Sequence, residues 1–330
     1  MEKIGIALIG CGYWGNNYFE TLKKMSSVAI KYVCDIKKPF ELQEKFTDNY
    51  KEAIEDEEVN SIVIATPTKT HYEIAKYALE HGKNVLVEKP MTSSSKEAED
   101  LIKIAEENNK ILMVGHTFMY NPAVNALKSC IEKGELGKIL SINARRLNLG
   151  PIRKEENVMW DLAPHDISMF LYLANSSPHK VSASGAKFIG NHEDIITLNL
   201  KMKNNVFSTA TVSWIYPLKI RDLVIVGDKK MAIFDDTNVN KLAIHDLGVE
   251  KIEDAYKNFH DYAITYREGD IILPKISGKK PLDIQCNHFI ECIRDNKKPL
   301  SDGKNGLEVV RVLECAQKSL DNNGAEVLVE

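Results

Sequence analysis

The stretch that decides the fold is Ile4-Gly5-Ile6-Ala7-Leu8-Ile9-Gly10-Cys11-Gly12-Tyr13-Trp14-Gly15. Its first six residues form an apolar run typical of a buried strand, and a G-x-G-x-x-G turn follows before a helical pattern. Such glycines let the backbone approach a pyrophosphate, whose charge meets free N–H groups at the helix N-terminus. The residues that we expect to contact a dinucleotide here are Gly10, Gly12, Tyr13, Trp14 and Gly15.

Asp35 stands 20 residues after Gly15, at the end of the next apolar run. A carboxylate at this place can accept hydrogen bonds from the adenosine ribose hydroxyls and would repel a 2′-phosphate. The position predicts NAD as the cofactor in preference to NADP, although Lys37 and Lys38 weaken that preference. The alternative for Asp35 is a solvated residue at a strand end.

The first 120 residues alternate short apolar runs with longer helical patterns, of which Tyr72–His81 and Lys96–Asn108 are examples. Continuous apolar strands separated by helices indicate a parallel sheet covered on both faces, which is the doubly wound α/β fold class. The expected strands are Ile4–Ile9, Ala29–Cys34, Ser61–Ala65, Asn84–Val87 and Ile111–Val114.

The pattern changes after Asn121-Pro122, where one helix runs towards Gly134 and strands with period-two alternation follow. Because these strands succeed one another without helices, we expect a largely antiparallel sheet. The expected strands are Ile139–Leu147, Val181–Phe188, Ile195–Met202, Val206–Trp214, Leu223–Gly227 and Lys230–Asp235, and the expected helices are Leu162–Leu173, Asp283–Arg294 and Asn305–Leu320. The predicted domains are a Rossmann domain over 1–120 and an α/β domain over 121–330, whose last helices are candidates for packing on the first domain.

The composition excludes several classes of protein. The chain has 330 residues and a formal net charge of −4 without a cluster of basic residues, which argues against a nucleic-acid partner. No apolar run approaches the roughly 20 residues of a membrane span, and the N-terminus does not resemble a signal peptide. Six scattered cysteines without a C-x-x-C pair predict reduced thiols, a cytoplasmic protein and no metal site.

Two further segments follow apolar strands at the edge of the parallel sheet where ligands gather. The first contains Thr66-Pro67, which we expect at the cofactor, and His71, which is either a polar helix cap or a cofactor contact. The second is Glu88-Lys89-Pro90.

Together with the segment from Trp160 to Ile167 and the stretch from His288 to Leu320, these motifs make the sequence resemble the Gfo/Idh/MocA family of sugar and inositol oxidoreductases over essentially its whole length. The resemblance implies a Rossmann domain followed by an α/β domain with an open, mainly antiparallel sheet. In the family that sheet often serves as an oligomer interface, which implies a homodimer or homotetramer.

The resemblance also implies the site residues. Lys89 corresponds to the active-site lysine, with a cis bond to Pro90 and with Glu88 beside the cofactor, and Asp161 and His165 match the D-x-x-x-H pair. Residues four apart share a helix face, and Pro164 is acceptable if it lies in the first turn. A helix N-cap is the alternative for Asp161. The expected catalytic residues are Lys89, Asp161 and His165.

The substrate prediction rests on a subgroup of the family. Many relatives carry an arginine before the aromatic-x-Pro that follows the fifth strand, where this chain has Met119. That departure, and the stretch from Arg145 to Gly150, resemble the subgroup that acts on nucleotide-linked amino sugars. Because Arg145 and Arg146 must point to opposite faces of a strand, only one can readily line a pocket. The expected substrate-binding residues are Lys89, Tyr120, Arg146, Asp161, His165 and Arg221.

The predicted reaction is NAD-dependent oxidation of a secondary hydroxyl to a ketone, at C3 of a UDP-linked N-acetylamino sugar. His165 would act as the base, and Lys89 would stabilise the oxygen or take the proton itself. Alternatives are a dehydrogenase of free inositol or a free aldose, a dinucleotide-binding regulator without activity, and an NAD-dependent glycosidase.

Overall fold

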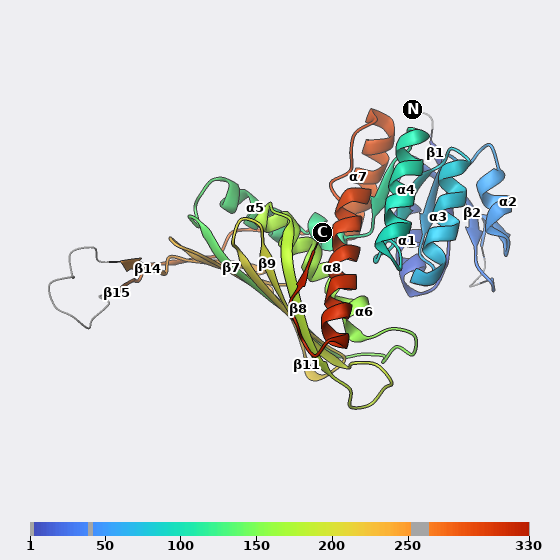
Figure 1. Ribbon diagram of the computed structural model, residues 1–330. Coiled ribbons are helices and arrows are strands. Elements are labelled where there is room, and N and C mark those ends of the chain that lie inside the picture. Colours follow the sequence, from blue (N-terminus) through green and yellow to red (C-terminus); the bar gives the residue numbers. More distant parts are fainter. Residues whose placement is uncertain (1–2, 39–41, 252–263, 330) are drawn as a thin grey trace. The chain divides into compact units, whose positions relative to one another are not determined.

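The computed structural model describes residues 3–38, 42–251 and 264–329. The chain divides into two compact units, each built from two separate stretches of sequence. Unit 1 comprises Met1–Asn121 and Lys279–Glu314, and unit 2 comprises Pro122–Gly278 and Cys315–Glu330. Helix α8 (Gly303–Asp321) contributes to both units, because the division falls at Glu314 (Figure 1). No helix in the described part of the chain has the length and apolar character needed to span a bilayer.

Unit 1 contains a six-stranded sheet in the order β3-β2-β1-β4-β5-β6, in which every neighbouring pair is parallel. The strands are β1 (Ile4–Ile9), β2 (Val28–Cys34), β3 (Lys45–Thr47), β4 (Ser61–Ile64), β5 (Asn84–Val87) and β6 (Leu112–Val114). The strand order reverses between β1 and β4, so their carboxyl ends flank the crevice at which doubly wound sheets bind ligands. The parallel sheet predicted from the apolar runs is confirmed.

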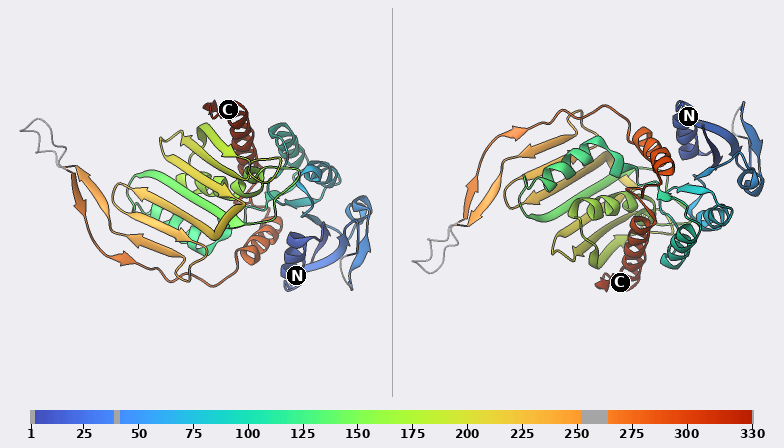
Figure 2. Two further views of the ribbon diagram at one scale, coloured as in Figure 1. Left: turned by 90° about the horizontal axis from the view of Figure 1, so that it is seen from below. Right: turned by 90° about the horizontal axis from the view of Figure 1, so that it is seen from above.

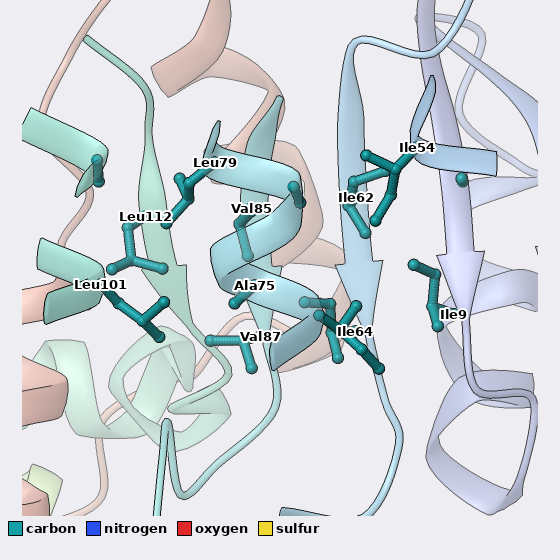
Figure 3. Close-up of a cluster of buried hydrophobic side chains, with 14 of the residues drawn as sticks. Ile9, Ile54, Ile62, Ile64, Ala75, Leu79, Val85, Val87, Leu101 and Leu112 are labelled. Carbon is teal, nitrogen blue, oxygen red and sulfur yellow. The ribbon is translucent and has the colours of Figure 1, made fainter. Parts of the chain in front are cut away.

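Helices cover the faces of this sheet. They are α1 (Tyr13–Leu22), α2 (Tyr50–Glu55), α3 (His71–Glu80), α4 (Ser95–Glu107) and α7 (Pro281–Asp295), with short 3-10 turns η1 (Thr68–Thr70) and η2 (Thr117–Tyr120). One core lies between the strands and α2, α3 and α4, where buried Ile62, Ile64 and Val85 of the sheet meet Leu79 and Leu101 of the helices (Figure 3). This burial fixes the strand ends that carry the site.

Unit 2 contains a nine-stranded sheet in the order β16-β13-β12-β11-β7-β10-β9-β8-β17, antiparallel except for the β7–β10 pair. Its long strands are β7 (Ile139–Leu149), β8 (Pro178–Ala186), β9 (Ile195–Met202), β10 (Phe207–Ser213), β11 (Ile215–Gly227) and β12 (Met231–Asp235). The short ones are β13 (Leu242–His245), β16 (Ile271–Ile272) and β17 (Val327–Leu328), and β14 (Gly248–Lys251) pairs with β15 (Ile264–Arg267) as a separate ribbon.

Helices α5 (Pro122–Glu132) and α6 (Val158–Ala174) cover one face of the nine-stranded sheet, and no helix among the described residues of unit 2 lies on the opposite face (Figure 2). The strands alternate accordingly, with buried Leu198 and Ala210 under the helices and the half-buried Thr197 and Thr209 on the other face. The mainly antiparallel sheet predicted from period-two alternation is confirmed.

Several elements differ from the expectation. Strand β11 begins at Ile215, eight residues before the predicted Leu223, and α6 begins at Val158 where Leu162 was expected. Pro164 consequently lies in the second turn of α6 and not in the first, and its missing N–H leaves the carbonyl of Trp160 without its usual helical partner.

Candidate functional site

The glycine-rich turn joins β1 to α1 at the crevice between β1 and β4. Gly10 has a φ of +88°, and a Cβ there would lie 2.7 Å from the backbone of Ala65, so the loops after β1 and β4 are in close contact. A Cβ on Gly15 would lie 2.0 Å from the carbonyl oxygen of Gly10. Gly12 differs, because its Cβ would meet nothing within 4 Å. Two glycines are therefore needed for packing, and the third leaves open space above the turn.

Helix α1 begins directly at that open space. Gly12 is its N-cap, and no side chain of a described residue caps the helix, so the N–H groups of the first turn are left for an external acceptor. The side chains of Tyr13 and Trp14 are 82% and 39% exposed, and their rings meet edge to face at 5.8 Å. These two residues are thus placed to offer backbone N–H groups to a phosphate.

Asp35 follows β2 and faces the same turn. Its Oδ2 accepts a hydrogen bond from the Cys11 N–H at 2.6 Å, and its Oδ1 accepts one from the Lys37 N–H at 3.4 Å. A carboxylate has about four acceptor sites, so capacity remains for ribose hydroxyls. Burial, with the Asp35 carboxylate nearby, raises the pKa of the Cys11 thiol to about 11. The uncapped helix, the open space at Gly12 and the placement of Asp35 fit a dinucleotide.

His71 links the loops after β4 and β5. It is the first residue of α3 and is 1% exposed, and its ring nitrogens lie 2.8 Å from the Thr66 carbonyl oxygen and 2.9 Å from that of Pro90. The helix-cap alternative is wrong, since Thr70 is the N-cap and makes no side-chain cap bond. Burial lowers the pKa of His71 most strongly, with the Lys89 charge adding to the effect. Because a neutral imidazole has one N–H, the ring donates to only one of these carbonyl oxygens, and it lies between the segments Thr66-Pro67 and Lys89-Pro90.

Lys89 lies two residues beyond β5, and its peptide bond to Pro90 is cis, as the resemblance implied. Glu88 beside it is only 6% exposed, and its side chain turns into unit 1. The Tyr18 hydroxyl donates to Glu88 Oε1 at 2.7 Å, the Lys89 N–H donates to Oε2 at 3.2 Å, and the Gln285 amide donates to the Tyr18 oxygen at 2.7 Å. Burial raises the pKa of the Glu88 carboxyl. The Glu88 carboxylate, which was expected beside the cofactor, therefore connects the backbone of Lys89 to Tyr18 inside unit 1.

His116 follows β6 at the same edge of the sheet. Its side chain is 1% exposed, and neither ring nitrogen has a hydrogen-bond partner among the described residues. Burial and the charge of Lys89 lower the pKa of His116 to about 3, so the ring is neutral at ordinary pH. The sequence prediction missed this residue, whose only signal was its place directly after a strand of the parallel sheet.

Asp161 and His165 lie in unit 2, one helical turn apart on α6. Asp161 Oδ2 accepts a hydrogen bond from Trp214 Nε1 at 3.0 Å and lies 3.5 Å from Arg153 Nε. Asp161 is not the helix N-cap: that residue is Asn157, whose side chain accepts from the Trp160 N–H at 3.3 Å. The Asp161 carboxylate instead contacts Trp214 and Arg153. Because Asp161 and His165 are four residues apart, they lie on the same face of α6.

The expected substrate-binding residues are placed differently from one another. Arg146 is 3% exposed, and its guanidinium donates to both oxygens of buried Asp166, at 3.1 and 2.8 Å. Because its guanidinium is already bonded to Asp166 inside unit 2, Arg146 is poorly placed to bind a phosphate of the substrate. Its neighbour Arg145 points to the opposite face and pairs with Asp222, as the strand geometry predicted. Arg221 is half-buried on β11.

Tyr120, which was expected to bind substrate, is buried inside unit 1. Ser301 Oγ donates its proton to the Val114 carbonyl oxygen at 2.6 Å, so the Tyr120 hydroxyl donates to Ser301 Oγ at 2.9 Å and accepts from the Ser301 N–H at 3.2 Å. The hydroxyl ties η2 to the stretch before α8. Within the described ranges, no three His, Cys, Asp or Glu side chains are placed to hold a metal ion.

Comparisons with known proteins agree with this arrangement. Residues 4–116 match the family model described as an oxidoreductase family with an NAD-binding Rossmann fold, and residues 124–233 match the GFO/IDH/MocA C-terminal domain. The chain is 26% identical to the UDP-N-acetylglucosamine 3-dehydrogenase of Acidithiobacillus ferrooxidans over 77% of this chain and 76% of that protein. It is 23% identical to the NAD-dependent scyllo-inositol 2-dehydrogenase of Bacillus subtilis over 78% of this chain and 74% of that protein.

Solved structures share the fold. The A. ferrooxidans enzyme superposes with a TM-score of 0.81 at 22% identity, covering 98% of this chain and 99% of its own. A levoglucosan dehydrogenase in complex with NADH and L-sorbose superposes with a TM-score of 0.83 at 18% identity over the whole of both chains. With both family models matched and the crevice built for a dinucleotide, the chain belongs to the GFO/IDH/MocA family of oxidoreductases and binds NAD through the Rossmann fold of unit 1.

Proposed function

We propose that this protein is an NAD-dependent dehydrogenase that oxidises a secondary hydroxyl of a sugar to a ketone. The observation that carries the proposal is the placement of Lys89 two residues beyond β5, next to the crevice at β1 and β4 and tied to it through His71. A cation at that point can hydrogen-bond an oxygen whose negative charge grows during oxidation.

In the proposed reaction the residues of the chain handle the proton and the charge. Bound NAD supplies the acceptor for a hydride from the carbinol carbon. His165 takes the hydroxyl proton as a general base, and Lys89 donates a hydrogen bond to the same oxygen. Asp161, held by Trp214, orients His165 and balances its charge. In the alternative assignment Lys89 itself takes the proton.

The substrate class that we propose is a UDP-linked N-acetylamino sugar oxidised at C3. It is supported by the similarity to the UDP-N-acetylglucosamine 3-dehydrogenase, while the inositol and levoglucosan dehydrogenases keep a free polyol or sugar as the second candidate. Arg221 stays a candidate for the diphosphate. Arg146 is not part of the proposed diphosphate site, because its guanidinium is paired with buried Asp166.

The test is a panel of UDP-sugars, free aldoses and inositols incubated with NAD and followed by the absorbance of the reduced nicotinamide. We expect turnover with UDP-N-acetylglucosamine, and Lys89→Ala and His165→Ala should each remove most of the chemical rate while NADH still binds. The exposed Lys103 and His179 supply the matched controls Lys103→Ala and His179→Ala. Full turnover in both active-site variants would defeat the assignment, no turnover with any sugar would favour a regulator, and release of an aglycone would favour a glycosidase.

We further propose a homodimer or homotetramer that uses the helix-free face of the unit 2 sheet. Val224 of β11 and Ile233 of β12 are directly paired and lie half-buried on that face. Replacing Ile233 by Asp places a charge there and should shift the sedimentation coefficient towards that of a monomer. An unchanged coefficient would place the interface elsewhere.

A further inference from the structure

His116 is an unusual histidine for the interior of a folded unit. The ring is 1% exposed, and both of its nitrogens lack a hydrogen-bond partner in the part of the chain that the structure describes. A buried polar group left without a partner destabilises the folded state, because it has lost its hydrogen bonds to water and gained none in return. Its backbone is ordinary by contrast, since the His116 N–H donates to Val114 and its carbonyl accepts from the Met119 N–H. The side chain, and not the backbone, is left unsatisfied.

The surroundings of His116 point to a ligand. The ring is close enough to Lys89 for the ammonium charge to act on it, and Lys89 is the cation of the proposed reaction. Both residues follow neighbouring strands, β5 and β6, whose carboxyl ends lie at the same edge of the sheet. A ligand that binds to Lys89 at this edge of the sheet would therefore lie near the imidazole of His116.

The strand order separates this position from the dinucleotide turn. From β1, which carries the glycine-rich turn, the sheet proceeds through β4 and β5 to β6. Neighbouring strands are about 4.8 Å apart, so His116 lies roughly 14 Å along the sheet from the pyrophosphate site, with Lys89 between them. The residue belongs to the far side of Lys89 from the cofactor phosphates, where a substrate would be bound.

We propose that His116 is a substrate-binding residue that hydrogen-bonds a hydroxyl group of the sugar next to the carbon that is oxidised. This inference rests on the proposed function. A neutral imidazole offers one N–H donor and one acceptor nitrogen, which matches a hydroxyl, itself both donor and acceptor. A phosphate or carboxylate would be held better by a cation, and Lys89 already supplies one.

A ligand role and a structural role predict opposite effects of the same substitution. In His116→Phe an aromatic ring of slightly larger size replaces the imidazole and both unsatisfied nitrogens are removed, so the midpoint of urea unfolding of the free protein should stay the same or rise. Because the sugar hydroxyl then loses its partner, kcat/KM for UDP-N-acetylglucosamine should fall by about tenfold to a hundredfold. The dissociation constant for NADH, read by its fluorescence, should change by less than about twofold. His81→Phe, at an exposed histidine of the same unit, is the matched control.

Two isosteric variants keep the test decisive if the phenylalanine does not fit. Asn places a carboxamide near Nδ1 and Gln places one near Nε2, so one of His116→Asn and His116→Gln should recover most of the lost kcat/KM. A substrate analogue deoxygenated next to the oxidised carbon should react equally with the wild type and His116→Phe. This loss of coupling identifies the hydroxyl that the ring contacts.

The outcomes separate this inference from the proposed function. Unchanged kcat/KM with a lower unfolding midpoint would make His116 a structural residue, and a parallel rise in the NADH dissociation constant would make it a cofactor contact; either result overturns the proposal. If the wild type turns over no sugar, the proposed function fails, and calorimetric titration of UDP-N-acetylglucosamine into the NADH complex decides the inference. Binding that is weakened by His116→Phe supports it, and equal or absent binding overturns it.

Discussion

The Tyr18 hydroxyl and the Glu88 carboxylate form a buried 2.7 Å hydrogen bond between α1 and the end of β5. Gln285 of α7 donates to the same hydroxyl oxygen, and the second oxygen of Glu88 accepts from the backbone of Lys89. The chain of contacts joins two helices to the loop of the proposed catalytic lysine. The fold of unit 1 and the position of that lysine therefore depend on one polar network.

Tyr18→Phe should destabilise unit 1. It leaves the Glu88 carboxylate and the Gln285 amide without their shared partner, and we expect the free energy of unfolding to fall by about 1–3 kcal/mol. The measurement is urea unfolding. The control is Tyr72→Phe, because Tyr72 also donates to a carboxylate at 2.7 Å, that of Asp100, but is partly exposed to water. A loss in the control as large as that in Tyr18→Phe would show that burial of the network is not the cause.

The three glycines of the turn should respond differently to alanine. Gly12→Ala adds a methyl group to open space, so the fold should be kept while the dissociation constant for NADH rises by at least about tenfold. Gly15→Ala drives a Cβ against the Gly10 carbonyl oxygen and should lower the unfolding free energy itself. Fluorescence titration and urea unfolding of both variants distinguish the two effects, and a destabilised Gly12→Ala with normal NADH binding would contradict this division.

Arg146 and Arg145 provide a matched pair of ion-pair tests on one strand. Arg146→Met leaves Asp166 as an unpaired buried charge and should cost about 3–5 kcal/mol of unfolding free energy, much of which the double variant with Asp166→Leu should restore. Arg145→Met breaks the more exposed pair with Asp222 and should cost less than about 1 kcal/mol. A stable Arg146→Met with weakened substrate binding would return this arginine to the list of substrate contacts.

Asp35 should set the choice of dinucleotide. In Asp35→Ser the carboxylate that would repel a 2′-phosphate is gone, and the ratio of kcat/KM for NAD over that for NADP should fall by about a hundredfold. Asp295→Ser, at a surface aspartate bonded to Lys297, is the control. An unchanged ratio would mean that Asp35 serves the turn through its bond to Cys11 and has no part in discrimination.

Acid should destabilise the protein through its buried histidines. The pKa of His116 is lowered from 6.5 to about 3, and burial lowers that of His71 as well. Between the unfolded and folded pKa values the unfolded chain binds more protons, so stability is full above pH 6.5 and falls as the pH drops towards 3. The slope is up to about 1.4 kcal/mol per pH unit for each histidine. Urea unfolding from pH 7 to pH 4 should therefore show a shallower fall for His116→Phe than for the wild type or His81→Phe. If the stability of His116→Phe fell with pH as steeply as that of the wild type, the lowered pKa of His116 would be refuted.

The sequence predicts those parts of the fold whose signals are local. The glycine-rich turn, the five predicted apolar strands of unit 1 and, apart from β11, the predicted alternating strands of unit 2 lie within a few residues of their predicted bounds. Strand β3 has three residues, of which Lys45 and Thr47 are polar, and the first part of β11 contains Pro217 and Lys219, so neither had a detectable apolar pattern. Helix α6 begins four residues before the predicted Leu162, and it contains Pro164 beyond the first turn, where proline is best tolerated.

The surroundings of the candidate site residues could not be predicted, because their partners are distant in sequence. Glu88 and Tyr18 are hydrogen-bonded although they are 70 residues apart in sequence, and Tyr120 and Ser301 are 181 residues apart. The periodicity of apolar residues does not predict such pairs. Arg146 is the clearest case. Its alternation on β7 was predictable, but the presence of Asp166 beneath it, on α6, was not. The roles of Lys89, Asp161 and His165 stay predictions.

The division of unit 1 into two stretches of sequence matters for synthesis on the ribosome. Its sheet emerges first, yet the partners of Tyr18 and Val114 are Gln285 and Ser301, which are translated after nearly all of unit 2. Unit 2 likewise awaits residues beyond Glu314. Unit 1 therefore cannot finish folding before α7 and the first part of α8 are synthesised, and unit 2 cannot do so before the residues after Glu314 are synthesised. The two units cannot fold one after the other in the order of their first residues.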